Sequence, residues 1–134
     1  MFQTVLFPVN DSRETREAAE VVANIVQKYN SRLVLLAVRV GVSEGQETLT
    51  MNDHEAIAKL LEGAKAMFAQ QGIEAEILER EGKPAFVTCD VADEIEANLI
   101  IIGSRGMGLT EEGVSDSVSN QIVNLSPCPV LVVP

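Results

Sequence analysis

The sequence lacks the residues on which several common kinds of functional site depend. It has 2 cysteines, 1 histidine and no tryptophan among 134 residues. The cysteines, Cys89 and Cys128, are too few and too far apart for a disulfide framework or a zinc site. Neither belongs to a Cys-x-x-Cys motif or adjoins a basic cluster, so we expect both to be small buried apolar side chains without redox chemistry.

Basic residues are scarce as well, because 10 Lys and Arg stand against 20 Asp and Glu and leave a net charge of −10. A chain with this charge repels nucleic-acid backbones and anionic lipid, so we expect neither a nucleic acid nor a membrane as partner. No apolar run approaches the roughly 18 residues of a membrane-spanning helix, and the start of the chain lacks the basic flank of a signal peptide. These absences predict a cytoplasmic protein.

The chain has the composition of an ordinary globular protein, with 46% hydrophobic and 22% charged residues. Its length predicts a single domain, residues 1–134. Apolar runs alternate with segments of helical periodicity, and we predict strands at residues 4–9, 33–40, 73–80, 99–102 and 128–133. A helix separates each consecutive pair, and residues 41–52 are expected to form a surface loop. This order predicts an α/β fold, an open doubly wound parallel sheet with helices on both faces and right-handed crossovers.

Individual residues refine this pattern. The strand at 73–80 alternates apolar and acidic residues, which predicts a sheet edge with one solvent-facing side. Gly72 stands where a helix C-terminal cap belongs, since glycine adopts the left-handed backbone without steric cost. In the last predicted helix Val118, Ile122 and Leu125 fall on one stripe, so we expect all three to face the core.

The stretch of residues 98–119 carries the strongest functional signal. A buried strand stops at Gly103, a glycine-rich loop follows, and a helix opens with Asp116, Ser117 and Ser119. Glycines let a backbone approach a ligand closely, and the free N–H groups of a helix start bind anions. The same order occurs in ordinary strand–helix connections, so the pattern alone leaves both interpretations open. Doubly wound sheets bind ligands beyond the carboxyl ends of the strands where strand order reverses, which points to Asn10 and Gly103.

Longer segments carry a family resemblance. They are the start VLFPVNDS, the segment EGKPAFVTCDVADEIEANLIIIGSRG and the end SPCPVLVVP. The chain resembles the universal stress protein family over essentially its whole length. That family's signature, G-x2-G-x9-G-[ST], is matched in register by Gly103, Gly106 and Ser117, with Ser119 as a further hydroxyl. The resemblance implies a Rossmann-like, adenine nucleotide alpha hydrolase-like fold with strand order 3-2-1-4-5.

The resemblance also implies a nucleotide site built from the ends of several strands. The adenosine half would meet Pro8, Val9 and Asn10 after the first strand and Val38 on the second. The phosphates would lie on the glycine loop and the helix that follows it, at Gly103, Arg105, Gly106, Asp116, Ser117, Val118 and Ser119. The implied ligand is ATP or AMP, with Mg²⁺ only in the company of the nucleotide.

Two of these positions depart from the family pattern. Asn10 replaces the usual Asp but keeps a hydrogen-bonding side chain of the same size, so the adenosine half can be retained. Asp116 replaces the third glycine of the signature and puts a carboxylate where a triphosphate would lie, near Glu111 and Glu112. Two like charges ~4 Å apart repel by about 4 kcal/mol at an effective dielectric of about 20, roughly a thousandfold in affinity. Arg105 offsets one charge, and a bound Mg²⁺ would reverse the sign, because carboxylates and phosphates together ligate it.

The residues leave three functional hypotheses open. The first is a non-enzymatic, dimeric stress-response protein with an altered regulatory site for an adenine nucleotide. The alternative is a family member that has lost nucleotide binding and acts only as a dimeric interaction scaffold. An enzyme is not expected, because no nucleophile and base can be named, and His54 is interpreted as an exposed residue at a helix start.

The last strand supplies the expected interface. It is apolar, and the family's strand order places it at a sheet edge, where backbone groups are unpaired. The resemblance therefore implies a homodimer in which the strand at 128–133 pairs in antiparallel fashion with its copy across a two-fold axis.

Overall fold

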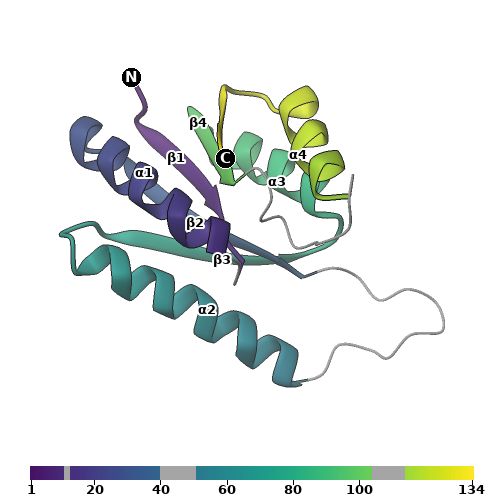
Figure 1. Cartoon of the computed structure of the whole chain (residues 1–134), viewed down its shortest axis with the longest axis horizontal. Coiled ribbons are helices and arrows are strands. Elements are labelled where there is room, and N and C mark those ends of the chain that lie inside the picture. Colours follow the sequence, from purple (N-terminus) through teal and green to yellow (C-terminus); the bar gives the residue numbers. More distant parts are fainter. Residues whose placement is uncertain (11–12, 40–50, 104–113) are drawn as a thin grey trace.

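The computed structural model describes residues 1–10, 13–39, 51–103 and 114–134, without the side chains of 13–14, 51–53 and 114–117. Its strands are β1 (Thr4–Pro8), β2 (Arg32–Arg39), β3 (Ala75–Glu81), β4 (Leu99–Gly103) and β5 (Val130–Val133). Its helices are α1 (Arg13–Tyr29), α2 (Met51–Ala69), α3 (Pro84–Glu94) and α4 (Val114–Leu125). The strands pair in parallel in the order β3-β2-β1-β4-β5 (Figure 1). The predicted fold class and strand order are confirmed.

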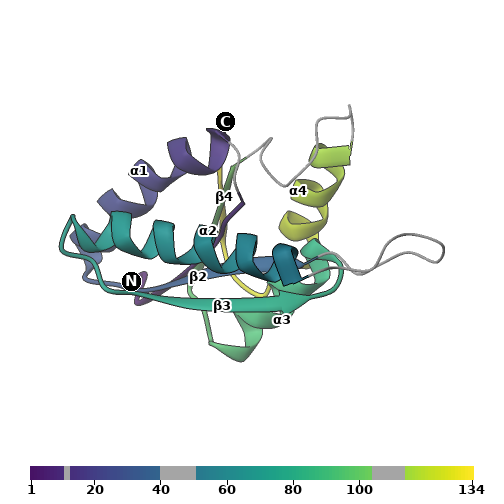
Figure 2. The same ribbon diagram turned by 90° about the horizontal axis from the view of Figure 1, so that it is seen from below.

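The helices form two layers, one on each face of the sheet. α1 and α2 cover one face, and α3 lies on the opposite side of β2 and β3, as Figure 2 shows. Side chains of β1 alternate between the layers, so that Val5 and Phe7 join the α1–α2 layer whereas Leu6 joins the α3–α4 layer. A strand buried on both faces needs an unbroken apolar run, which explains the composition of the central strands. No helix in the described ranges has the length and hydropathy needed to cross a bilayer.

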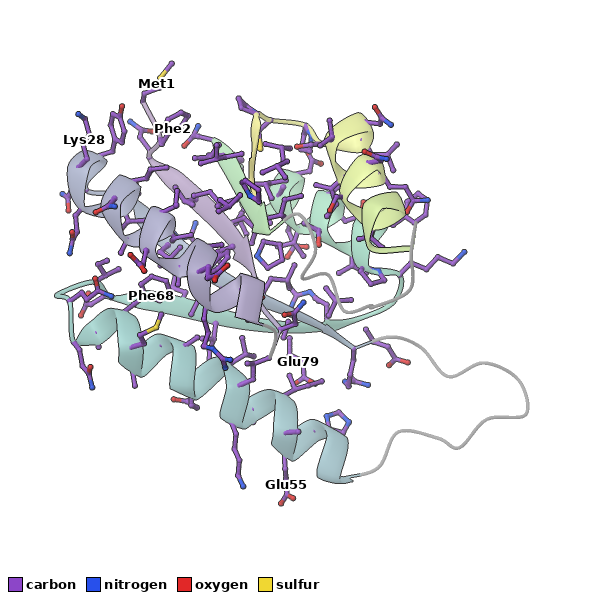
Figure 3. The ribbon with its side chains drawn as sticks, viewed as in Figure 1. Met1, Phe2, Lys28, Glu55, Phe68 and Glu79 are labelled. Carbon is purple, nitrogen blue, oxygen red and sulfur yellow. The ribbon has the colours of Figure 1, made fainter. Side chains whose placement is uncertain are left out.

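Two phenylalanines lie at the centre of the α1–α2 layer. Phe7 of β1 and Phe68 of α2 are among the largest fully buried side chains, and their rings meet edge to face with centroids 6.3 Å apart. Figure 3 shows Phe68 pointing from α2 toward the sheet, whereas Glu55 of the same helix points away from it. An edge-to-face pair contributes about 0.5–1.5 kcal/mol beyond the burial of its rings. The pair thus fixes α2 against the central strand.

α2 ends in a hydrogen-bonded motif centred on Gly72. The Gly72 N–H donates to the Ala69 carbonyl and the Ile73 N–H donates to the Phe68 carbonyl, each at 3.0 Å. Gly72 has a φ of 80°, in the left-handed region that favours glycine. This confirms the predicted cap, and the motif turns the chain into β3, which occupies the predicted sheet edge.

Two predictions about the C-terminal region were wrong. The apolar stripe predicts a buried Leu125, but this side chain is 48% exposed, because α4 ends there and Ile122, one turn earlier, makes the buried contact. The last strand begins at Val130 rather than at residue 128. Ser126 turns the chain before it, since its hydroxyl donates to the Cys128 carbonyl at 2.6 Å and accepts the Cys128 N–H at 3.1 Å.

Both cysteines belong to the α3–α4 layer. Cys89 is buried as predicted, with its Sγ 3.9 Å from the Ile122 carbonyl oxygen, whereas Cys128 lies in the turn before β5 and is only half-buried. Burial is the main factor that raises the pKa of the Cys89 thiol, and Asp90 and Cys128 raise it further. Burial also raises the pKa of Cys128, and a hydrogen bond from Ser126 opposes this shift.

Replacing Phe68 with Ala should lower the free energy of unfolding by about 3–5 kcal/mol, since it removes a buried ring and leaves a cavity against Phe7. Phe86 of α3, which is 48% exposed, offers a matched control. Phe86→Ala should cost at most about 0.5 kcal/mol. Urea unfolding followed by circular dichroism measures both, and equal losses would contradict a central role for Phe68.

Thiol reactivity should follow the raised pKa values. Only the thiolate attacks an aromatic disulfide reagent, so at about pH 7 each cysteine should react more slowly than in the urea-unfolded chain, with rates that rise toward about pH 9. Cys89→Ser and Cys128→Ser variants separate the two groups, and the half-buried Cys128 should react faster. Reaction of Cys89 at the unfolded-chain rate would contradict its burial under α4.

Candidate functional site

β1 and β4 are the strands between which the order of the sheet reverses. The register between them ends at Leu6 and Ile100, although β1 continues to Pro8 and β4 continues to Gly103. On their other sides both strands stay paired to their ends, β1 with β2 and β4 with β5. The facing edges of β1 and β4 therefore part at the carboxyl end of the sheet, where doubly wound folds bind ligands.

Pro8 explains why this ladder stops. The Val9 N–H donates to the Leu36 carbonyl at 2.8 Å, so odd-numbered residues of β1 direct their backbone groups toward β2. The backbone groups of even-numbered residues point toward β4, as the 2.7 Å hydrogen bond from the Asn98 N–H to the Thr4 carbonyl shows. Pro8 is the next residue that would donate toward β4, and proline has no N–H. The missing N–H of Pro8 thus ends the pairing of β1 with β4, where the strand order of the sheet reverses.

Asn10 follows this proline and is tied to the start of α1. Its Oδ1 accepts a hydrogen bond from the Thr15 hydroxyl at 2.6 Å, and its backbone N–H donates to the same hydroxyl oxygen at 3.4 Å. This reciprocal pair orients the Asn10 side chain at the carboxyl end of β1. Sequence reasoning missed Thr15, although a hydroxyl residue in the first turn of a helix is an available signal for capping.

The carboxyl ends of β2 and β3 carry a cluster of ion pairs next to Val38. Arg39 Nε lies 2.8 Å from Glu79 Oε2, and Arg39 Nη1 lies 3.3 Å from Glu81 Oε1. His54 Nδ1, near the start of α2, lies 3.4 Å from the same Glu79 oxygen, and this side chain is 48% exposed, as predicted. The hydrogen bond to Glu79 is the main factor that raises the pKa of the Arg39 guanidinium. The charge of Arg39 is therefore balanced by two glutamates of β3.

The phosphate half of the predicted site is described only in part. Gly103 ends β4 in a buried position. α4 begins at Val114, so Asp116 is its third residue and Ser117 its fourth, within the turn whose N–H groups lack helical partners. Outside the described residues lie Arg105, Gly106, Gly108, Glu111, Glu112 and Gly113.

The parallel sheet brings the other predicted residues to one end of the molecule. Pro8, Val9, Asn10 and Val38 lie at the carboxyl ends of β1 and β2, the same edge at which β4 ends. Val38 packs against the α3–α4 layer, as does Val118 of α4, and Ser119 is buried. The described residues of the first half thus share the carboxyl end of the sheet with Gly103, while Val118 and Ser119 lie in the α4 helix that follows β4.

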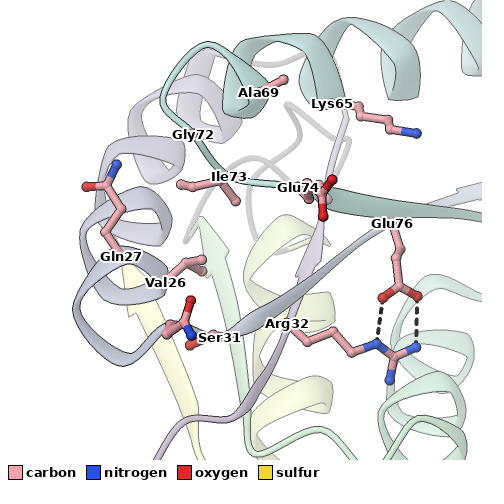
Figure 4. Close-up of a pocket in the computed structure, with 12 residues that line it drawn as sticks. Val26, Gln27, Ser31, Arg32, Lys65, Ala69, Gly72, Ile73, Glu74 and Glu76 are labelled. Atoms are coloured by element: carbon pink, nitrogen blue, oxygen red, sulfur yellow. Dashed lines mark hydrogen bonds and ion pairs between the residues drawn. The ribbon is translucent and has the colours of Figure 1, made fainter.

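A larger cleft lies at the opposite end of the sheet. It measures about 1020 Å³ and is lined by the first residues of β2 and β3 and the last turns of α1 and α2 (Figure 4). Arg32, on its wall, is bonded to Glu76 through contacts of 2.7 and 2.8 Å. Helix C-termini carry the negative end of the helix dipole, which disfavours anions here. A smaller cleft of about 260 Å³ adjoins Asn10 at the carboxyl end.

Known proteins resemble this chain in sequence and in architecture. The profile of the Universal stress protein family matches residues 1–134. The universal stress protein Sll1654 of Synechocystis is 54% identical over 136 residues, which cover 100% of this chain and 87% of the relative. The crystal structure of a universal stress protein in complex with cAMP has a TM-score of 0.80 at 22% identity, over 99% of this chain and 97% of the other. The universal stress protein from Archaeoglobus fulgidus in complex with dAMP has a TM-score of 0.78 at 17% identity, over 99% and 98%.

These comparisons carry different weight. The solved structures have low identity to this chain and bear on the fold alone. The family profile spans every residue, and the Synechocystis relative is identical at more than half of the aligned positions. On that ground the chain belongs to the universal stress protein family.

Proposed function

We propose that this protein is a non-enzymatic, dimeric stress-response protein whose regulatory ligand is an adenine nucleotide with a single phosphate. The observation that carries the proposal is the early end of the β1–β4 ladder at Pro8. It leaves backbone groups of β1 and β4 unpaired with each other where the strand order reverses. Asn10 lies beside this point, and Gly103, the first residue of the family signature, ends β4 at the same edge of the sheet. Structural neighbours in complex with cAMP and dAMP support the class of ligand.

Asn10 supports the adenosine half of the site. Its Oδ1 is oriented by Thr15, and an amide carries N–H donors as well as an acceptor, whereas the Asp usual in the family carries only acceptors. An uncharged amide adds no repulsion toward a nucleotide. Val38, half-buried at the end of β2, supplies an apolar contact close to the base.

Asp116 supports the restriction to a single phosphate. As the third residue of α4 it belongs to the turn whose free N–H groups would bind a phosphate. A carboxylate there repels each further phosphate charge at ~4 Å by about 4 kcal/mol at an effective dielectric of about 20. ATP is therefore expected to bind less well than AMP, and Mg²⁺ to narrow the difference.

The second candidate is a scaffold that binds no nucleotide. Asp116 also favours this function. A carboxylate in the first turn of a helix can accept that turn's own N–H groups, which would fill the anion site from within. The protein would then act only through its dimer surface. Nucleotide binding by the wild type separates the two candidates.

The surroundings of His54 support a role without catalysis. It is the only histidine of the sequence, and its Nδ1 lies beside the Glu79 carboxylate. Among the described residues no hydroxyl or thiol contacts its ring, so a positioned nucleophile and base do not occur together there. ATP hydrolysis by the protein is expected to be no faster than in buffer.

The C-terminal strand supports a homodimer. β5 forms one edge of the described sheet, and its Val132 is 37% exposed. α4, which packs beside β5, exposes Val123 and Leu125 as well. An edge strand with exposed apolar side chains presents unpaired backbone groups to a second copy. Antiparallel pairing of β5 across a two-fold axis would bury the unpaired backbone groups and the exposed apolar side chains of this strand.

Calorimetric titration without Mg²⁺ should show that AMP binds the wild type more tightly than ATP does. Asp116→Gly removes the carboxylate and restores the glycine of the signature, so it should raise the affinity for ATP by roughly 10- to 1000-fold and change the affinity for AMP less. Asp116→Asn is the matched control for the change in side-chain size, because it removes the charge and keeps the size of the side chain.

Nucleotide released when the purified protein is denatured, identified by ion-exchange chromatography, gives an independent measurement. Failure of the wild type and of both variants to bind AMP or ATP at millimolar concentration would rule out a nucleotide-regulated protein. An empty wild type together with ATP binding by Asp116→Gly would instead favour the scaffold.

Val132→Lys should convert the dimer to a monomer or to aggregates, because it places a charge in the centre of the β5 interface. Phe86→Lys, at an exposed position of α3, is the control and should leave the dimer intact. Size exclusion with light scattering measures the mass of each variant. A Val132→Lys variant that remains fully dimeric would place the interface elsewhere.

A further inference from the structure

The smaller cleft lies between α1 and α2, on the face of the sheet away from α3 and α4. It has a volume of about 260 Å³ and is lined chiefly by apolar side chains. The buried rings of Phe7 and Phe68 lie at its base, and α2 contributes Leu60, Ala64 and Met67 to its wall. Figure 3 shows Phe68 between the two helices. The cleft therefore offers an apolar surface to a small ligand.

Two basic side chains give this cleft a positive rim. Arg16 of α1 and Lys59 of α2 line it and are exposed, and no acidic residue is among its lining residues in the described part of the chain. Arg32, Arg39 and Arg80 each pair with a glutamate. Neither cation of the rim forms an ion pair with any residue that the structure describes. In a chain with a net charge of −10, two uncommitted cations beside an apolar cleft complement an amphipathic anion.

Gly63 keeps the cleft open on the side of α2. It lies in the interior of that helix, where glycine weakens a helix relative to alanine. A Cβ atom built at this position would meet no atom within 4 Å, so packing does not require a glycine here. A larger side chain would occupy the cleft, because Gly63 is one of the residues that line it.

The cleft differs from the nucleotide site proposed above. Its base and walls belong to the α1–α2 layer, whereas Val38 and Val118, which would contact the nucleotide, pack in the α3–α4 layer. Among the residues that the structure describes, the two sites share Val9 and Asn10, at the end of β1. Apart from these two residues, the walls of the cleft and the proposed nucleotide contacts Val38 and Val118 lie on opposite faces of the sheet.

We propose that the α1–α2 cleft binds a small amphipathic anion, a carboxylate on an apolar body of roughly eight carbons. The apolar body lies against Leu60, Ala64 and Met67, above the buried rings of Phe7 and Phe68, and the carboxylate accepts charge-assisted hydrogen bonds from Arg16 and Lys59. A volume of about 260 Å³ is just below the common range for ligand pockets and limits the ligand to about ten heavy atoms.

The probe for this site is octanoate, followed through the methyl group of Met67. The sequence has 4 methionines, and Met67 lines the cleft. In protein labelled with ¹³C-methyl methionine, octanoate should shift the Met67 signal saturably with a Kd of roughly 0.1–1 mM. Met67→Leu identifies the signal. Octylammonium has the same apolar body and the opposite charge, and it should bind at least about tenfold more weakly.

Two variants test the two parts of the site. Gly63→Leu fills the cleft and keeps both cations, and it should weaken octanoate binding at least about tenfold. Ala66→Leu, at an exposed position of the same helix, is the control and should bind like the wild type. Lys59→Gln keeps the apolar wall and should weaken binding about three- to tenfold.

Three outcomes would overturn the proposal. The first is a Met67 signal that does not move, or that moves equally with octanoate and octylammonium. The second is unchanged octanoate binding by Gly63→Leu. The third is displacement of octanoate by AMP, which would assign the cleft to the nucleotide site. AMP binding to Gly63→Leu is measured separately, so a failure of this proposal is distinguishable from a failure of the nucleotide proposal.

Discussion

The central strand β1 forms hydrogen bonds with a neighbour on each side, and Pro8 lets only one of the two ladders reach the end of the strand. Toward β2 the bonds continue to the Val9 N–H, whereas toward β4 the pairing ends at Leu6. One missing backbone donor therefore separates β1 from β4 at the carboxyl end of the sheet. Asn10, two residues after Pro8, then joins the end of β1 to the start of α1 through its hydrogen bonds with Thr15.

Charge is divided unevenly around this edge. At this edge Glu79 and Glu81 of β3 pair with Arg39 of β2. In an acidic chain, an anion at the carboxyl edge is attracted mainly by backbone N–H groups and the dipole at the start of α4. Asp116 lies in that turn and limits how much negative charge it can receive. Arg16 and Lys59, which form no ion pair with a described residue, lie instead beside the α1–α2 cleft.

Most of the fold could be predicted because its signals are local. Apolar runs marked all five strands, Gly72 marked the end of α2, and alternation in β3 marked a sheet edge. The errors at Leu125 and at the start of β5 have one cause, since Ser126 ends α4 and turns the chain through bonds that helical periodicity does not report. The family resemblance added the strand order, which hydrophobic patterns alone do not specify.

The sequence by itself determined the α/β class, the helix and strand periodicities, the acidic balance and the departures at Asn10 and Asp116. Each of these is a property of residue type or of spacing along the chain. Only the tertiary structure decided that Pro8 faces β4, that Glu79 joins Arg39 to His54, and that Phe7 and Phe68 form the base of a cleft with a basic rim. These relations join residues far apart in the chain, and they depend on which strands flank β1 and which helices share a face. No local period carries that information.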